Sequence, residues 1–128
     1  MKYLGIDYGK RKIGLAISTE EKLATPYSVL KVSSEGKAIE KIRRILDEEN
    51  LDRIVLGISE GKVAVETKDF ASKLEKSLDI KVLFYDETLT TKDAQEMSIE
   101  AGIKRKKRRN MEDAYSATLI LQGYLDSQ

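Results

Sequence analysis

Hydrophobic and polar positions alternate along the first part of the chain and then give way to helical periodicity. Two apolar runs, residues 3–6 and 13–17, flank a short polar connection that contains Gly9, and this is the pattern of a β-hairpin. A third strand is expected at residues 27–32, with Pro26 at its entrance. That position suits proline because it has no backbone donor to contribute to a sheet. The chain is therefore expected to open with three strands of antiparallel character.

Later segments alternate between short β-branched runs and stretches in which apolar residues recur at helical spacing. Buried strands are expected at residues 53–58 and 80–85. Helices are expected at about residues 38–49, 63–78, 94–102 and 110–125. The last of them is expected to begin at Asn110, a good N-cap residue. Because strand–helix alternation favours parallel pairing, we predict one α/β domain over residues 1–128, with a mixed five-stranded sheet and helices on both faces.

Composition narrows the class of protein. A length of 128 residues is typical of one domain. A hydrophobic fraction of 41% with a charged fraction of 35% fits a globular protein rather than a disordered one. No apolar run approaches the roughly 18 residues of a membrane span, and the chain enters a strand at once, without the apolar segment of a signal peptide. We therefore expect a cytoplasmic protein with no membrane partner.

Two missing residue types limit any metal chemistry. The chain has no cysteine and no histidine, which excludes disulfides, thiolate ligands, and imidazole ligands or bases. Any metal must then be bound by oxygen atoms, which favours magnesium, manganese or calcium. The net charge is only +1, so binding to nucleic acid would depend on local clusters of basic residues rather than on the whole molecule.

Carboxylates lie at the ends of two predicted strands. Asp7 follows an apolar run, and burying a lone carboxylate there is costly unless a backbone donor, a cation or a metal compensates its charge. Three small residues leave room nearby for backbone or ligand: Gly5, Gly9 and Gly14. Asp86 and Glu87 end a second strand. If the two strands are parallel neighbours, these acids meet at the carboxyl edge of the sheet, where ligands bind in such folds.

Each acid also has a plain structural interpretation. Asp7 could form a turn by accepting backbone hydrogen bonds. Only one of Asp86 and Glu87 points to a given face, because neighbours on a strand face opposite ways, and the residues alone do not decide which. Asp113 lies three residues after Asn110, the spacing of a helix cap, and it could cap, bind a metal or do both. Two further acids, more simply solvent-facing, are Glu60 and Glu112.

Basic residues form two clusters close to these acids in the sequence. One occupies the connection between the first two strands, and the other immediately precedes Asp113. The members are Lys10, Arg11 and Lys12, and Lys104, Arg105, Lys106, Lys107, Arg108 and Arg109. A charge run often marks only a solvated segment, but Lys and Arg contacts to phosphate supply most sequence-independent affinity for nucleic acid. We favour nucleic-acid binding, by backbone and shape rather than by base stacking, because aromatic residues make up only 6% of the chain.

Three motifs follow one another in a recognisable order. They are Leu4–Gly9 with Ile13–Ala16, Asp86–Glu87 with Leu89–Thr91, and Asp113–Ala114 with Ala117 and Ile120–Leu125. Each is weak alone, but the combination spans nearly the whole chain and resembles the YqgF/RuvX family. That family is described as pre-16S ribosomal RNA nucleases and as Holliday-junction-resolvase-like proteins. The resemblance implies an RNase H-like fold with catalytic, metal-binding acids at Asp7, Glu87 and Asp113.

The resemblance also implies the chemistry and the partner. Such a nuclease would process the 5′ end of precursor 16S rRNA. Our hypothesis for its chemistry is that Asp7 bridges two cations, Mg²⁺ or Mn²⁺, about 4 Å apart, while Glu87 and Asp113 each support one. The protein would act as a monomer or homodimer. One alternative is a Holliday junction resolvase-like endonuclease acting on branched DNA, and another is a non-catalytic RNA-binding ribosome assembly factor. A sugar-kinase-like ATPase is a third, since an aspartate followed by glycines on a hairpin suits phosphate, but 128 residues supply only one of the two lobes needed.

Overall fold

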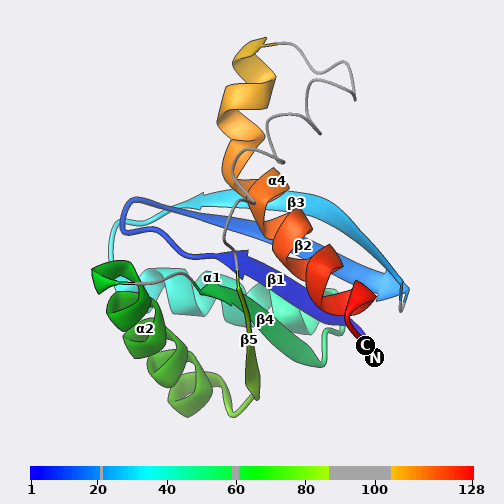
Figure 1. The fold of residues 1–128 in the computed structure, drawn as a ribbon. Helices are drawn as coiled ribbons and strands as arrows, with labels where there is room; N and C mark the ends of the chain where they lie inside the picture. Colours follow the sequence, from blue (N-terminus) through cyan, green and yellow to red (C-terminus); the bar gives the residue numbers. More distant parts are fainter. Residues whose placement is uncertain (21, 59–60, 87–104) are drawn as a thin grey trace.

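The structure is a computed structural model that describes residues 1–20, 22–58, 61–86 and 105–128 (Figure 1). Its strands are β1 (Tyr3–Asp7), β2 (Lys12–Glu20), β3 (Leu23–Lys31), β4 (Arg53–Ile58) and β5 (Val82–Asp86). Its helices are α1 (Glu35–Glu48), α2 (Lys62–Leu78) and α4 (Arg105–Asp126). None of the helices in this part of the chain combines the length with the apolar composition that a bilayer-spanning segment requires.

The strands form one mixed sheet in the order β3-β2-β1-β4-β5. β2 pairs antiparallel with both β1 and β3, whereas β4 lies parallel to β1 on one side and to β5 on the other. β1 is therefore central, and its carboxyl end lies at the same edge of the sheet as the carboxyl ends of β4 and β5. This arrangement confirms the predicted mixed five-stranded sheet.

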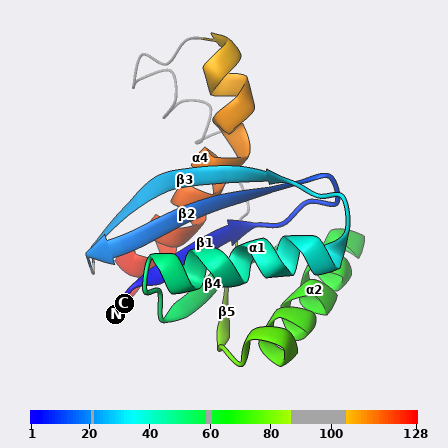
Figure 2. The same cartoon turned by 180° about the vertical axis from the view of Figure 1, so that it is seen from behind.

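Side chains alternate between the two faces of the sheet and build two cores. On β1, Leu4 and Ile6 are fully buried in the larger core, between the sheet and the pair α1 and α2. The other face packs on α4, where Val55 and Ala117 belong to the smaller core. Figures 1 and 2 show these layers from opposite sides, with α1 and α2 covering one face and α4 crossing the other. The predicted helices on both faces are thus confirmed.

Two predicted boundaries are wrong. β3 begins at Leu23 and not at residue 27, so Pro26 lies inside the strand, opposite Ala16, where the register shifts. β3 is an edge strand, and an edge position or bulge tolerates a residue that lacks a backbone donor. α4 begins by Arg105, so Asn110 is an interior residue and not the N-cap. Arginine and lysine are strong helix formers, and the basic run continues the helix without any apolar periodicity to reveal it. The helix expected at residues 94–102 lies outside the described residues.

Candidate active site

The backbones of Asp7 and Asp113 both lie against Gly14. Asp7 is the last residue of β1 and pairs directly with Gly14 of β2, and residues opposite one another in an antiparallel pair project to the same face. A Cβ atom on Gly14 would overlap the carbonyl group of Asp113 and lie 2.9 Å from the backbone nitrogen of Ala114. The backbone of α4 therefore rests on β2 at this point. Residues more than a hundred positions apart in the sequence are brought to one edge of the sheet.

Alternation along β1 gives the direction of the Asp7 side chain. Gly5 lies two residues earlier, on the same face, and a Cβ atom there would be 2.7 Å from the Cβ atom of Leu121 on α4. Ile6, between them, is buried in the opposite core. The Asp7 side chain therefore projects to the face that α4 covers, which is the face where Asp113 lies.

Asp113 is half-buried, and its surroundings oppose its negative charge. Burial raises the pKa of the Asp113 carboxyl above its ordinary value, the neighbouring carboxylate of Glu112 raises it further, and the Lys12 ammonium acts in the opposite direction. A carboxylate in this environment is stabilised by an additional cation. A divalent metal fits this donor set, because the chain has no histidine or cysteine and the acids offer only the oxygen ligands that Mg²⁺ and Mn²⁺ prefer.

The third predicted acid, Glu87, lies outside the described residues, as does Glu60. Within the described ranges no group of three acidic side chains is assembled in a metal-binding arrangement. Asp86, the residue before Glu87, can be assigned to one face of the sheet. Leu83 and Tyr85 pack in the core under α4, so alternation directs the exposed Asp86 to the opposite face, away from Asp7. Asp86 therefore does not belong with the Asp7–Asp113 pair.

The basic residues divide into three groups. Lys10 forms an ion pair with Glu66 on α2, with 3.0 Å between Nζ and Oε1, and Lys12 lies close enough to Asp113 to influence its pKa. Arg105–Arg109 form the beginning of α4, which stands clear of the sheet in Figures 1 and 2, although their side chains are not described. Lys104 lies outside the described residues. The assignment of these residues to nucleic-acid binding stays a prediction.

Sequence reasoning missed how the connection after Asp7 is held in place. The ring of Tyr8 stacks on the buried ring of Phe70 from α2, with centroids 4.5 Å apart and planes inclined by 27°. The Lys10–Glu66 ion pair joins the same two segments. The apolar spacing of α2 indicated only that Phe70 is a core residue, because no local pattern encodes a contact between segments sixty residues apart. Stacking on the fully buried Phe70 ring holds the backbone next to Asp7, and the exposed ion pair adds little to it.

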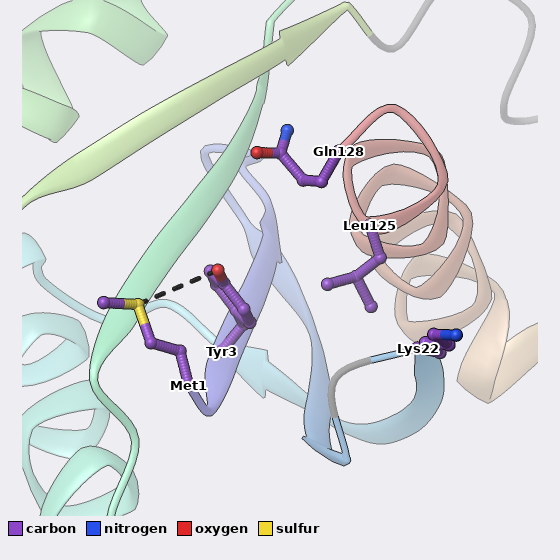
Figure 3. Close-up of a pocket in the computed structure, with 5 residues that line it drawn as sticks. All are labelled: Met1, Tyr3, Lys22, Leu125 and Gln128. Atoms are coloured by element: carbon purple, nitrogen blue, oxygen red, sulfur yellow. Dashed lines mark hydrogen bonds between the residues drawn. The ribbon is translucent and has the colours of Figure 1, made fainter.

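A pocket at the other end of β1 lies apart from these acids. It has a volume of about 310 Å³ and is lined by Met1, Tyr3, Lys22, Leu125 and Gln128 (Figure 3). Tyr3 is the first residue of β1 and Asp7 the last, so the length of the strand separates this pocket from the Asp7–Asp113 pair. The pocket is therefore not part of the candidate active site.

Comparisons of the sequence with known proteins match nearly its whole length. The model of the family described as "RuvX: Holliday junction resolvase" matches residues 1–127. A protein of Halothermothrix orenii is 38% identical over the whole chain and 96% of its own length. A protein of Carboxydothermus hydrogenoformans is 39% identical over 98% of the chain and 96% of its own length. Both relatives carry the name "Putative pre-16S rRNA nuclease".

Solved structures confirm the RNase H-like fold. The RuvC protein of T. thermophilus in complex with a Holliday junction substrate matches with a TM-score of 0.67 and 18% identity, over 99% of this chain and 96% of that one. The Fowlpox virus resolvase in complex with Holliday junction DNA matches with a TM-score of 0.66 and 16% identity, over 99% and 98% of the two chains. At these identities the likeness concerns the fold alone.

Proposed function

The chain belongs to the RuvX family, and on that premise we propose that it is a metal-dependent endonuclease that hydrolyses phosphodiester bonds at the 5′ end of precursor 16S rRNA. Relatives 38% and 39% identical, each matched over nearly its full length, carry the name of a pre-16S rRNA nuclease. The observation that supports the proposal most directly is that the backbones of Asp7 and Asp113 both lie against Gly14, at the carboxyl edge of the sheet.

Asp7, Asp113 and Glu87 are the proposed metal ligands. Divalent cations bound there would activate water for attack and neutralise charge on the leaving oxygen. Asp7 and Asp113 come from different elements, a strand end and a helix, which lets their carboxylates approach one cation from different directions. Burial of Asp113 supports this role, because it leaves a carboxylate whose charge a cation would stabilise.

The proposed substrate path runs beside the acids, along the basic side of the site. Lys12 already lies near Asp113, and the beginning of α4 carries an unbroken series of basic residues, Arg105–Arg109. Cationic side chains of this kind contact phosphates and hold a strand without reading its bases. In this proposal they orient the sugar–phosphate backbone, and the acids act on one of its phosphodiester bonds. Precursor rRNA as substrate implies action in the cytoplasm.

A second candidate function is cleavage of branched DNA. It is favoured by the description of the matching family and by the two resolvase structures of the same fold, both determined with Holliday junctions. Resolution of a junction requires paired cuts, so this function would require a homodimer. The two candidates share the acids and the metal and differ in the nucleic acid.

A cleavage assay distinguishes these candidates. End-labelled precursor 16S rRNA and a labelled four-way DNA junction are incubated with the protein, with Mg²⁺ or with EDTA. We expect Mg²⁺-dependent cleavage of the RNA and a loss of at least about 100-fold in Asp7→Asn, since even residues that only support metal ligands commonly cost 10- to 100-fold. Asp47→Asn is the matched control, because Asp47 is an exposed acid on α1, on the other face of the sheet.

Three results would contradict the proposal in different ways. Cleavage of the junction but not of the RNA would favour the resolvase. Cleavage that persists in EDTA, or in Asp7→Asn, would remove the metal site from the mechanism. Binding of precursor RNA with no cleavage of either substrate would favour a non-catalytic assembly factor.

A further inference from the structure

We propose that Gly14 is a positioning residue for the candidate active site. Its missing side chain lets the backbone of α4 rest directly on β2, and this contact sets where Asp113 lies relative to Asp7. The inference rests on the proposed metal-dependent function and goes beyond it, because it assigns the precision of the site to a residue that has no functional group of its own.

At Gly14 the three atoms nearest to an added Cβ atom all belong to the backbone of α4: the carbonyl carbon and oxygen of Asp113 and the amide nitrogen of Ala114. A Cβ atom on Gly9 would also meet backbone, but that of Lys12 at the start of β2 and not that of a helix. A Cβ atom on Gly123 would meet the side-chain ring of Tyr85, and one on Gly36 would meet nothing within 4 Å. A side chain can rotate away from an added methyl group, but the backbone of a helix can only move with the helix.

The position of this contact relates it to the acids. Gly14 is the direct partner of Asp7 in the sheet, and paired residues of antiparallel strands have Cα atoms about 4.5–5.5 Å apart. The same glycine touches the peptide group of Asp113. One residue thus contacts the backbone of both acids, so the distance between β2 and α4 at Gly14 also sets the separation of the two backbone positions from which the carboxylates project.

An added methyl group would enlarge that distance. Non-bonded carbon atoms settle about 3.5–4.0 Å apart, so an alanine at position 14 would displace this part of α4 by something on the order of 1 Å. Catalytic groups tolerate roughly 0.5 Å of misplacement, and about 1 Å can cost 100-fold in rate. The displacement would move Asp113 while its chemistry stays intact.

Gly5 provides a matched control. It also lies under α4, where a Cβ atom would be 2.7 Å from the Cβ atom of Leu121 and 3.0 Å from the carbonyl oxygen of Ala117. Leu121 follows Asp113 by eight residues, which is about 12 Å along a helix. Gly5→Ala therefore disturbs the same interface between sheet and helix, but one to two helical turns beyond Asp113 along α4 and without touching the backbone of Asp113.

The experiment measures Mn²⁺ binding by isothermal titration calorimetry in the wild type, Gly14→Ala, Gly5→Ala and Asp7→Asn. We expect Gly14→Ala to weaken Mn²⁺ binding at least about 10-fold, and Gly5→Ala to stay within about 3-fold of the wild type even where it lowers the melting temperature. On RNA, Gly14→Ala should lower kcat by a larger factor than it raises KM, because the chemical step depends on the placement of the acids more steeply than binding depends on a shift of the basic residues of α4. Equal loss of affinity in both alanine variants would show that Gly14 is only structural and would overturn the inference.

A longer acid tests the same geometry by rescue. Asp113→Glu alone should weaken Mn²⁺ binding, because the carboxylate then projects too far from a fixed helix. In the Gly14→Ala background the additional methylene should restore part of the affinity. Should Gly14→Ala not fold, as judged by circular dichroism, the single variant Asp113→Glu decides: affinity equal to the wild type would overturn the inference.

The outcomes separate this inference from the proposed function. If wild type and Asp7→Asn bind Mn²⁺ equally, the proposed metal site is wrong. If the wild type binds Mn²⁺ through Asp7 and Gly14→Ala binds it equally well, only the positioning role is wrong.

Discussion

Gln122 attaches α4 to the hairpin of β2 and β3, and its loss makes a quantitative prediction. Its side-chain Oε1 accepts the backbone N–H of Ala24 at 2.9 Å. Its Nε2 donates to the carbonyl oxygen of Lys22 at 2.8 Å and to Oδ1 of Asp126 at 3.0 Å. Two of these partners are backbone groups, one a donor and one an acceptor, so both ends of the amide are used. Gln122→Ala removes all three hydrogen bonds.

The three bonds are not equivalent. Ala24 is 7% exposed, so in this variant its N–H would lose its acceptor where little water can replace it. An unsatisfied buried donor costs about 1–3 kcal/mol of stability. Lys22 and Asp126 are exposed, and water replaces their lost partner at little cost. We therefore expect Gln122→Ala to reduce the free energy of unfolding by about 2 kcal/mol. For 128 residues this corresponds to a fall of about 7 °C in Tm.

Urea unfolding followed by circular dichroism at 222 nm measures this free energy. Gln122→Glu keeps an oxygen acceptor for Ala24 but loses the donor to the exposed Lys22 carbonyl, and it adds a repulsion with Asp126 one helical turn away, worth about 0.2–0.5 kcal/mol. Because the buried N–H stays satisfied, this variant should lose less stability than Gln122→Ala. Gln128→Ala is the control, because its exposed amide reaches only Tyr124 and Ser127. A loss below about 0.5 kcal/mol in Gln122→Ala, or an equal loss in Gln122→Glu, would refute the assignment of the energy to the buried N–H of Ala24.

Three further changes have expected outcomes. Burial raises the pKa of the Asp113 carboxyl above its ordinary value of 3.8. Between these two pKa values the folded protein holds a proton on Asp113 that the unfolded chain has lost. The free energy of unfolding therefore falls as the pH rises from 3.8 through the raised pKa. In EDTA, Asp113→Asn should therefore melt above the wild type at pH 7, and the difference should disappear below about pH 3. Ser34→Ala removes the Ser34 Oγ that accepts the Lys37 N–H at the start of α1, and urea unfolding should show a loss of about 1 kcal/mol. Phe70→Ala leaves a cavity under Tyr8, and the same measurement should show a loss of about 3–5 kcal/mol.

The fold was predictable from the sequence where one face of an element is buried. The alternation at β1 and β2 and the apolar stripe of α1 follow from such burial, and those elements lie within a few residues of their predicted bounds. The start of α4 was not predictable in this way. Its first turns stand clear of the sheet, so no apolar stripe marks them, and the stripe begins only at Ala114, where the helix reaches the sheet.

The candidate site was predictable in part. The motifs single out Asp7 and Asp113, and the structure places the backbones of both against Gly14, whereas their role as metal ligands stays a prediction. The helix cap expected near Asp113 is wrong because α4 begins earlier. The choice between Asp86 and Glu87 stayed open in the sequence, and strand alternation now excludes Asp86 from the face of Asp7. The contact between Gly14 and Asp113 joins segments distant in the sequence, so only the packed fold reveals it.

Asp7 and Asp113 are synthesised at different times, and this has a consequence for when the site can form. Asp7 belongs to the first strand and Asp113 to the last helix, about a hundred residues later. Ribosomes add roughly 5–20 residues per second, so the second acid follows the first by about 5–20 seconds. A nascent chain that has formed only the hairpin and α1 has half of the pair. Any activity that needs both acids therefore starts only after α4 has emerged from the ribosome and docked on the sheet.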